Sequence, residues 1–252
     1  MFDVVVVSGV VGFFLCYFIL KLTNRPKKTK NIEKLNNNMI SYTPKHFEEK
    51  NEEILIDFIE KYNFGMIITF DDENIKCSHL PFFIEKKNEK IFLYGHVAKG
   101  NSIFRLFERT KPNGEYFKSN NESLIIFNGP HGYISPNDYE TQIDNVPTWN
   151  YTTVHCYGNP KMIQNENLKF EMMNKIVENE ENKFKESNYK KWKIEIAKKD
   201  YIQKNMENIF LFEIEITKIE GKFKLSQNKP MKTRDRLINI LKKRNPELSK
   251  FM

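Results

Sequence analysis

Short strand-like segments joined by polar turns are the feature that most constrains how this chain can fold. Three of them follow one another at 64–70, 75–85 and 91–97, and only the polar residues 71–74 and 86–90 separate them. Connections this short suit antiparallel neighbours, because a parallel pair needs a crossover of a dozen or more residues. The segments therefore predict an antiparallel β-meander.

The remainder of the chain mixes further strands with helices. Strands are expected at 123–129, 149–158 and 209–221, and helices at 52–62, 101–108, 166–184, 199–208 and 233–244. The assignments follow the period of the hydrophobic residues, which is two in a half-buried strand and 3.6 in a helix. About six strands with interspersed helices predict a mainly β fold of the α+β class, built as a closed or nearly closed antiparallel barrel.

The formal net charge of +7 lies at the two ends of the chain. Residues 21–34 carry a net charge of +5 and residues 222–252 carry +8, whereas residues 35–221 carry −5 and Asp3 adds −1. A body that binds nucleic acid is expected to present a positive face of its own, so direct nucleic-acid binding is not expected. Three cysteines without regular spacing indicate neither a disulfide framework nor a zinc site, and they favour a reducing compartment.

A run of uncharged residues at 4–20 precedes a basic stretch. At 1.5 Å per residue, this run spans roughly 25 Å as a helix, the short end of what crosses a bilayer. Positive charge after the run places the C-terminal side in the cytosol. We therefore expect a single-pass transmembrane anchor at 1–22, a polar basic linker at 23–40 and a cytosol-facing domain at 41–252. A cleaved signal peptide and a buried core helix are the alternatives.

Local clusters of special residues mark where a ligand could bind. His79 and Pro81 lie inside one strand, and a proline there indicates an edge or a bulge. The segment 95–101 ends a strand and opens a helix, so its backbone amides and Lys99 form a candidate anion site. A lone histidine in a strand is more often a hydrogen-bonded structural residue than a ligand, so these clusters alone do not define a chemistry.

Six blocks of sequence resemble, in the same order, the motif series of the PaiB-like FMN-binding proteins, a bacterial family named for a negative transcriptional regulator. The blocks are YTPKHF at 42–47, SHLPF at 78–82, GHVAKGN at 95–101, FNGPHGYISPNDY at 127–139, VPTWNY with VHCYG at 146–158, and EGKFKLSQNKP at 220–230. The resemblance implies a split β-barrel of the pyridoxamine-phosphate-oxidase type that binds FMN and is usually dimeric.

The resemblance also implies where the cofactor lies. Lys99, Gly100 and Asn101 would hold the FMN phosphate, and the strand 78–80 would line the flavin ring. Residues 149–151 would come from the partner of a homodimer, and residues 224–228 would close the site. The candidate cofactor-binding residues are Ser78, His79, Leu80, His96, Lys99, Gly100, Asn101, Trp149, Asn150, Tyr151, Lys224, Ser226, Gln227 and Asn228. No catalytic residue and no metal ligand is assigned.

The function that follows from the resemblance is an FMN-dependent oxidoreductase of unknown substrate. The cofactor would do the redox chemistry, and the protein would position it. Two alternatives stay open. One is a non-catalytic regulator that binds flavin, and the other is a haem-binding split barrel in which His79 or His96 ligates iron.

Overall fold

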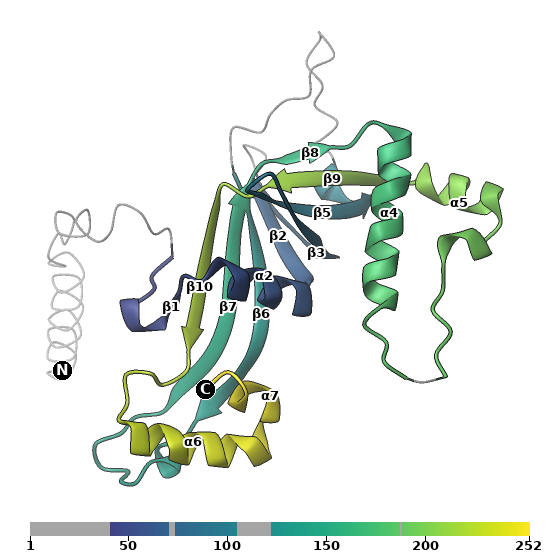
Figure 1. Cartoon of the computed structure of the whole chain (residues 1–252). Helices are drawn as coiled ribbons and strands as arrows, with labels where there is room; N and C mark the ends of the chain where they lie inside the picture. The colour runs from purple at the N-terminus through teal and green to yellow at the C-terminus, as the bar shows by residue number, and fades with distance from the viewer. Residues whose placement is uncertain (1–40, 71–73, 105–121, 187) are drawn as a thin grey trace, which may run out of the picture. The chain divides into compact units, whose positions relative to one another are not determined.

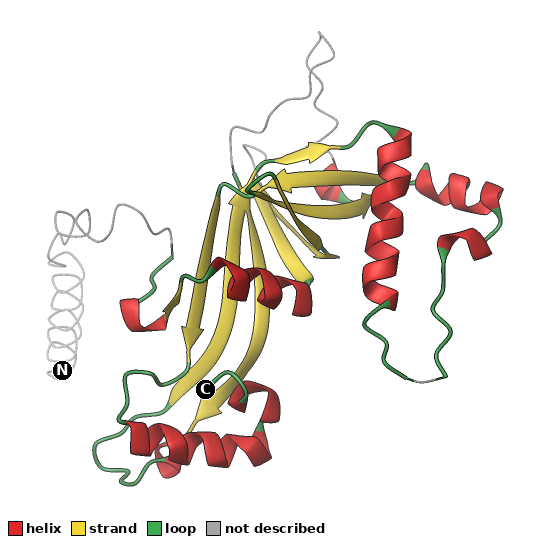
Figure 2. Ribbon diagram, viewed as in Figure 1, coloured by secondary structure: helices red, strands yellow, loops and turns green. Residues whose placement is uncertain are grey.

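The computed structural model describes residues 41–70, 74–104, 122–186 and 188–252, and Thr43–Met252 form one compact unit. Figures 1 and 2 show its strands and helices. The strands are β1 (Glu48–Glu49), β2 (Phe64–Phe70), β3 (Ile75–Pro81), β4 (Phe83–Lys87), β5 (Lys90–Ala98), β6 (Ser123–Ile134), β7 (Thr148–Gly158), β8 (Pro160–Met162), β9 (Ile209–Glu215) and β10 (Lys218–Lys224). The helices are α2 (Glu52–Lys61), α4 (Glu166–Glu181), α5 (Lys199–Met206), α6 (Met231–Arg244) and α7 (Pro246–Ser249), and the 3-10 turns are η1 (Lys45–Phe47), η2 (Ser102–Phe104), η3 (Pro136–Asp138) and η4 (Ile194–Ile196).

The described strands form two antiparallel sheets. Sheet A has the strand order β1-β10-β7-β6-β2-β3, and sheet B has the order β4-β5-β9-β8. The prediction of a mainly β, antiparallel fold with helices is confirmed. The expected closure is corrected, because neither sheet closes on itself among the residues that the structure describes.

Two segments predicted as single strands instead pass from one sheet to the other. Segment 75–85 divides at Phe82 into β3 of sheet A and β4 of sheet B, and segment 209–221 divides into β9 of sheet B and β10 of sheet A. At the second crossing, Ile216 N–H donates to a carbonyl of β5, and Thr217 N–H donates to a carbonyl of β7, both at 2.9 Å. Each crossing bends a strand that the hydrophobic pattern alone describes as continuous.

Sterics explain why Gly158, at the corner of the sheets, is a glycine. A Cβ atom at Gly158 would lie 2.4 Å from the carbonyl oxygen of Glu215, which is a backbone atom and cannot move aside. Gly158 ends β7 where β9 approaches, so the close passage of the two sheets requires a residue without a side chain.

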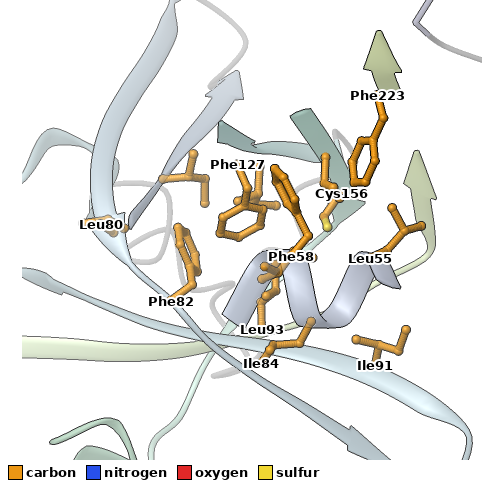
Figure 3. Close-up of a cluster of buried hydrophobic side chains, with 14 of the residues drawn as sticks. Leu55, Phe58, Leu80, Phe82, Ile84, Ile91, Leu93, Phe127, Cys156 and Phe223 are labelled. Atoms are coloured by element: carbon orange, nitrogen blue, oxygen red, sulfur yellow. The ribbon is translucent and has the colours of Figure 1, made fainter. Parts of the chain in front are cut away.

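The main hydrophobic core lies between the inner faces of the two sheets and is covered by α2. Figure 3 shows Phe82 and Phe127 at its centre with Leu55 and Phe58 of α2 beside them. The rings of Phe82 and Phe127 meet edge to face at 5.5 Å, and both side chains are fully buried. Asn51 caps α2 by accepting from two backbone N–H groups of its first turn.

The predicted helices largely agree with the structure. α2, α4, α5 and α6 lie where 52–62, 166–184, 199–208 and 233–244 were expected, with ends shifted by up to three residues. Of the expected helix at 101–108, the structure describes only the turn η2, and residues 105–108 lie outside the described residues.

The prediction of a membrane-anchored protein is corrected. No helix within the described ranges of the chain is long and apolar enough to span a bilayer. The predicted anchor at 1–22 and the linker at 23–40 lie outside the described residues. The structure therefore gives no support to a single-pass protein with its domain facing the cytosol, and that localisation is corrected.

Candidate functional site

The structure divides the predicted site residues into two groups that lie on different strands. The first, called the β3/β5 group, contains Ser78, His79, Leu80, His96, Lys99, Gly100 and Asn101. The second, called the β7/β10 group, contains Trp149, Asn150, Tyr151, Lys224, Ser226, Gln227 and Asn228.

Within the β3/β5 group, hydrogen bonds join Ser78 of β3 to Asn101, which follows β5. The Asn101 amide donates to Ser78 Oγ at 2.8 Å, and Asn101 Oδ1 accepts from the N–H of Ile103 at 3.0 Å. The sequence blocks SHLPF and GHVAKGN therefore meet in space. Asn101 closes the turn after β5 in the manner of an Asx residue, which leaves the preceding Lys99 and Gly100 at the surface.

Lys99 and Gly100 form an open corner beside this contact. The backbone of Lys99 is fixed, because its N–H donates to the carbonyl of Asn208 at 3.0 Å. Its ammonium lies 5.4 Å from the ring centroid of Phe210, a cation–π contact. A Cβ atom at Gly100 would meet nothing within 4 Å. The corner thus offers a cation and an accessible backbone to a ligand.

The other members of the β3/β5 group do not face this corner. Successive side chains of a strand point to opposite faces, so His79 lies on the outer face of sheet A, where its ring stacks against Phe64 at 6.3 Å. Leu80 belongs to the buried core. His96 is on the side of β5 that Tyr94 occupies, toward the cluster beneath α4.

The environment of His96 favours the neutral imidazole. Burial lowers the pKa of His96, and its Nδ1 has no hydrogen-bond partner among the described residues. A buried imidazole without a partner is costly. A ligand could therefore form a hydrogen bond with His96 Nδ1. His96 does not contact the Ser78–Asn101 pair in this arrangement.

Four members of the β7/β10 group, Asn150, Lys224, Ser226 and Asn228, line a cavity of about 280 Å³ at the far end of sheet A. The cavity is lined by Phe47, Tyr139, Asp144, Val146, Thr148, Asn150, Lys224, Ser226, Asn228 and Lys229. Four of the six sequence blocks contribute to this lining: the blocks 42–47, 127–139, 146–158 and 220–230. The blocks thus converge on two places, two of them at the Ser78–Asn101 contact and four at this cavity.

A buried hydrogen-bonded pair, Asn150 and Ser226, forms part of the lining of this cavity. Asn150 is fully buried, donates to Ser226 Oγ at 3.0 Å and accepts from it at 3.1 Å. Ser226 has a φ of 63°, a left-handed conformation that is uncommon for a residue with a side chain. Gln227 holds the same turn through its side chain, which accepts from Leu225 N–H at 2.7 Å and donates to the carbonyl of Phe223.

Lys224 braces the start of β7. Its ammonium donates to Thr148 Oγ1 at 2.5 Å and to the carbonyl oxygen of Trp149. Burial lowers the pKa of Lys224, and the neighbouring cation Lys222 adds to this effect. The lysine therefore positions the backbone of Trp149 and is less accessible to a ligand than Lys99.

Trp149 presents its indole ring to solvent. The side chain is 54% exposed, and its ring meets Tyr133 at 5.9 Å and His131 at 6.2 Å. Tyr151 lies beneath the Lys222 ammonium, 5.5 Å from its ring centroid. An exposed indole held on a fixed backbone is a ready surface for another flat ring.

The two groups do not meet within one chain. Ser78 pairs with Ile67, Ile67 with Ile125, and Ile125 with Cys156, so Ser78 is level with Cys156 of β7. Trp149 lies seven residues away from Cys156 along the same strand, which is roughly 23 Å at the rise of a β-strand. Figure 1 shows β6, β7 and β10 extending past β2 and β3 toward α6.

Sequence reasoning missed a set of side chains on the outer face of sheet A. Tyr157 donates to Glu220 Oε2 at 3.0 Å across the β7–β10 pair, and Lys218 forms an ion pair with Glu220 at 2.7 Å. His155 lies opposite Glu220, and burial lowers its pKa. The alternation of residues 151–157 places His155 and Tyr157 on one face, but the partner Glu220 depends on strand pairing.

The chain belongs to a family of FMN-binding proteins. The family described as "Putative FMN-binding domain" matches residues 41–218, which is most of the chain. The chain is 31% identical over 188 residues to the protease synthase and sporulation protein PAI 2 of Bacillus subtilis, covering 75% of this chain and 83% of that protein. An uncharacterized protein of Emericella nidulans is 30% identical over 188 residues, covering 66% of this chain and 74% of that protein.

Solved structures with a similar arrangement include two proteins of distant sequence. The flavocytochrome Anf3 of Azotobacter vinelandii has 12% identity and a TM-score of 0.47, over 70% of this chain and 69% of that one. An FAD and heme binding protein of Mycobacterium smegmatis has 9% identity and a TM-score of 0.48, over 75% and 78%. The assignment rests on the sequence matches, which confirm both the resemblance to the PaiB-like proteins and FMN as the cofactor.

Proposed function

We propose that this protein is an FMN-dependent oxidoreductase whose flavin lies between two copies of the chain. The observation that carries the proposal is membership of the FMN-binding family over residues 41–218. FMN supplies one- and two-electron transfer when it is bound, and the protein must hold the flavin, exclude water and admit a substrate.

The β3/β5 group is suited to the phosphate end of FMN. It combines the ammonium of Lys99, the amide of Asn101 and the hydroxyl of Ser78, and all three can donate hydrogen bonds to phosphate oxygens. The space beside Gly100 is open, so a phosphate can approach the backbone there. Lys99 and Asn101 would bind the phosphate, and Ser78 would keep the Asn101 amide in place.

The β7/β10 group is suited to the flavin ring. Trp149 offers an exposed aromatic surface, and Lys224 holds its backbone. The ring would stack on this indole, which would exclude water from one of its faces. Because Trp149 and Ser78 are far apart along sheet A in one chain, the Trp149 at each site would come from the partner.

A homodimer also accounts for the outer face of sheet A. Phe64 is 66% exposed, Phe70 43% and Ile75 76%, and Met66 and His79 are register partners on the same face. Large apolar side chains gathered on one sheet face mark an interaction surface. A symmetric pair would cover this face in both copies at once and would create two equivalent sites.

The experiment that tests the proposal is an absorption spectrum of the purified full chain, followed by mass analysis of the released cofactor and a titration with FMN. We expect flavin bands, release of FMN and one flavin per chain. Addition of NADH or NADPH under anaerobic conditions should then bleach the flavin bands.

Each outcome separates the alternatives. Colourless protein that takes up no FMN rejects flavin binding, and a haem spectrum favours the haem-binding alternative. Stoichiometric FMN that neither NADH, NADPH nor dithionite-reduced mediators can reduce would exclude the oxidoreductase and leave a non-catalytic flavin-binding regulator.

A further inference from the structure

A cavity lies beside α4 and α5, and Lys99 is the one residue of its lining that belongs to the six sequence blocks. Its volume is about 780 Å³, and its apolar lining includes Phe170 of α4, Ile194 of η4, Ile202 and Met206 of α5, and Phe210 of β9. Figure 1 shows α4 and α5 beside the ends of β5 and β9. Small-molecule sites commonly have volumes of roughly 300–1,000 Å³, and close-packed interiors leave few voids of even a single water, so packing alone does not account for this space.

The cavity opens because α4 packs on sheet B with only part of its length. Met172 and Ile176 are buried against Tyr94 and Leu211 and form a second hydrophobic cluster. Nearer the N-terminus of the helix, Phe170 stays 41% exposed and lines the cavity. The helix is therefore fastened at its middle, and its first turns form one wall of a hollow that η4 and α5 complete.

A buried cation lies in the wall of this cavity. The Lys169 side chain is only 9% exposed, and its ammonium is 3.6 Å from Glu166 Oε2, which is longer than a hydrogen bond. Glu166 is 78% exposed, so its carboxylate is strongly solvated and compensates the buried ammonium weakly. An ammonium in this position gains most from an anion that approaches from the cavity side.

The other charged residues of the lining lie at its rim. Glu195, Glu207, Lys99 and Lys199 are exposed, so solvent screens their charges. Charge interactions are stronger at the less exposed Lys169, where the effective dielectric constant is lower. The inner part of the cavity thus combines apolar walls with one positive charge.

We propose that this cavity binds a small apolar molecule carrying one anionic group, with the anion paired to the Lys169 ammonium. The apolar body lies against Phe170, Ile202 and Met206. The cavity adjoins the proposed phosphate site, because Lys99 lies in its lining, but the anion is paired to Lys169 and not to Lys99. The proposal does not depend on whether the protein is an oxidoreductase.

The test compares two fluorescent probes that differ by one anionic group: 8-anilinonaphthalene-1-sulfonate and the neutral N-phenyl-1-naphthylamine. Both are titrated into the full chain and into three variants. We expect Lys169→Met to weaken the sulfonate probe about tenfold and to change the neutral probe by less than twofold, since a charged hydrogen bond is lost. Ile202→Trp should weaken both probes by filling the cavity, and Lys204→Met, an exposed lysine of α5 outside the lining, should change neither.

Three results would overturn the proposal. Equal weakening of both probes by Lys169→Met would remove the anion selectivity, and unchanged binding in Ile202→Trp would place the probes elsewhere. Competition between FMN and the sulfonate probe, absent with riboflavin, would assign the cavity to the flavin phosphate. Thermal unfolding of each variant, with a midpoint near that of the parent chain, guards against a folding defect.

Discussion

The two groups of predicted site residues differ in how much of their structure they hold without a ligand. In the β7/β10 group, Asn150 and Ser226 are buried and bonded to each other, and Lys224 already has two acceptors. In the β3/β5 group, Lys99 and Gly100 are exposed, and the space beside Gly100 is open. The polar side chains of the β7/β10 group bond to one another and stabilise the fold. The β3/β5 group, in contrast, leaves donors at the surface that a ligand can bind.

This difference leads to opposite expectations for mutation. Removing a buried, bonded side chain should reduce the stability of the protein, because its partner is left unsatisfied. Removing an exposed donor should leave stability nearly unchanged and should reduce ligand affinity alone. The proposed dimer links the two groups, so a change at the interface should affect the flavin most of all.

The largest effect is expected from Phe64→Glu. This change places a charge on the outer face of sheet A, where we propose that the partner packs, and desolvating it would oppose association. The variant should sediment as a monomer and should lose at least about 100-fold in FMN affinity, because each site would lack its second wall. Tyr201→Glu on α5 is a matched control, since Tyr201 is 64% exposed and lies off this face. A Phe64→Glu monomer that binds FMN as tightly as the parent would refute the shared site.

Asn150→Ala should come next and should act on stability. The change removes a fully buried amide and leaves the Ser226 hydroxyl without its partner. The free energy of unfolding, measured by urea titration without flavin, should fall by about 2 kcal/mol. Asn228→Ala in the same cavity is the control, because Asn228 is exposed, and it should change stability by less than about 0.5 kcal/mol. Equal effects of the two changes would show that burial does not distinguish them.

Lys99→Ala should change ligand affinity and leave stability alone. Because Lys99 is exposed and its ammonium makes a cation–π contact with the Phe210 ring, the free energy of unfolding should change by less than about 0.5 kcal/mol. FMN should bind roughly tenfold or more weakly, whereas riboflavin, which has no phosphate, should bind as before. The comparison of these two ligands by fluorescence quenching is the measurement. Equal loss for both would show that Lys99 does not contact the phosphate.

The smallest effect concerns an ion pair behind the β7/β10 group. Arg244 of α6 bonds the Asp138 carboxylate at 2.5 Å. Burial alone would raise the pKa of Asp138, but the bonds from Arg244 and from the Ser135 N–H hold it below its usual value. A carboxyl with a lowered folded pKa stabilises the protein above its unfolded pKa, near 3.8, and this contribution disappears as the pH falls through the folded pKa.

Arg244→Met should therefore cost up to about 1 kcal/mol at neutral pH, since the arginine is half exposed. The difference between parent and variant should shrink as the pH falls below about 4. Urea unfolding at a series of pH values measures this. A difference that stays constant to the lowest pH would assign the loss to packing and not to charge.

The sequence by itself determined several things about this protein. The period of its hydrophobic residues located most strands and four helices, because that period records which side chains face the core. The six ordered blocks identified the family and its cofactor, because the residue types that bind a ligand persist as short local patterns. They also predicted that Lys99 and Asn101 hold the phosphate of the cofactor, which stays a prediction.

Only the tertiary structure decided how these pieces meet. Pro81 marks an edge or a bulge beside Phe82, but it does not show that the chain passes to the other sheet there, and the bend between β9 and β10 has no such signal. The pairing of Asn150 with Ser226 and of Tyr157 with Glu220 joins residues more than sixty positions apart. The separation of the two groups, and the cavity beside α4, follow from strand register and helix packing. These depend on the whole set of contacts that the folded chain makes, and a local pattern cannot encode them.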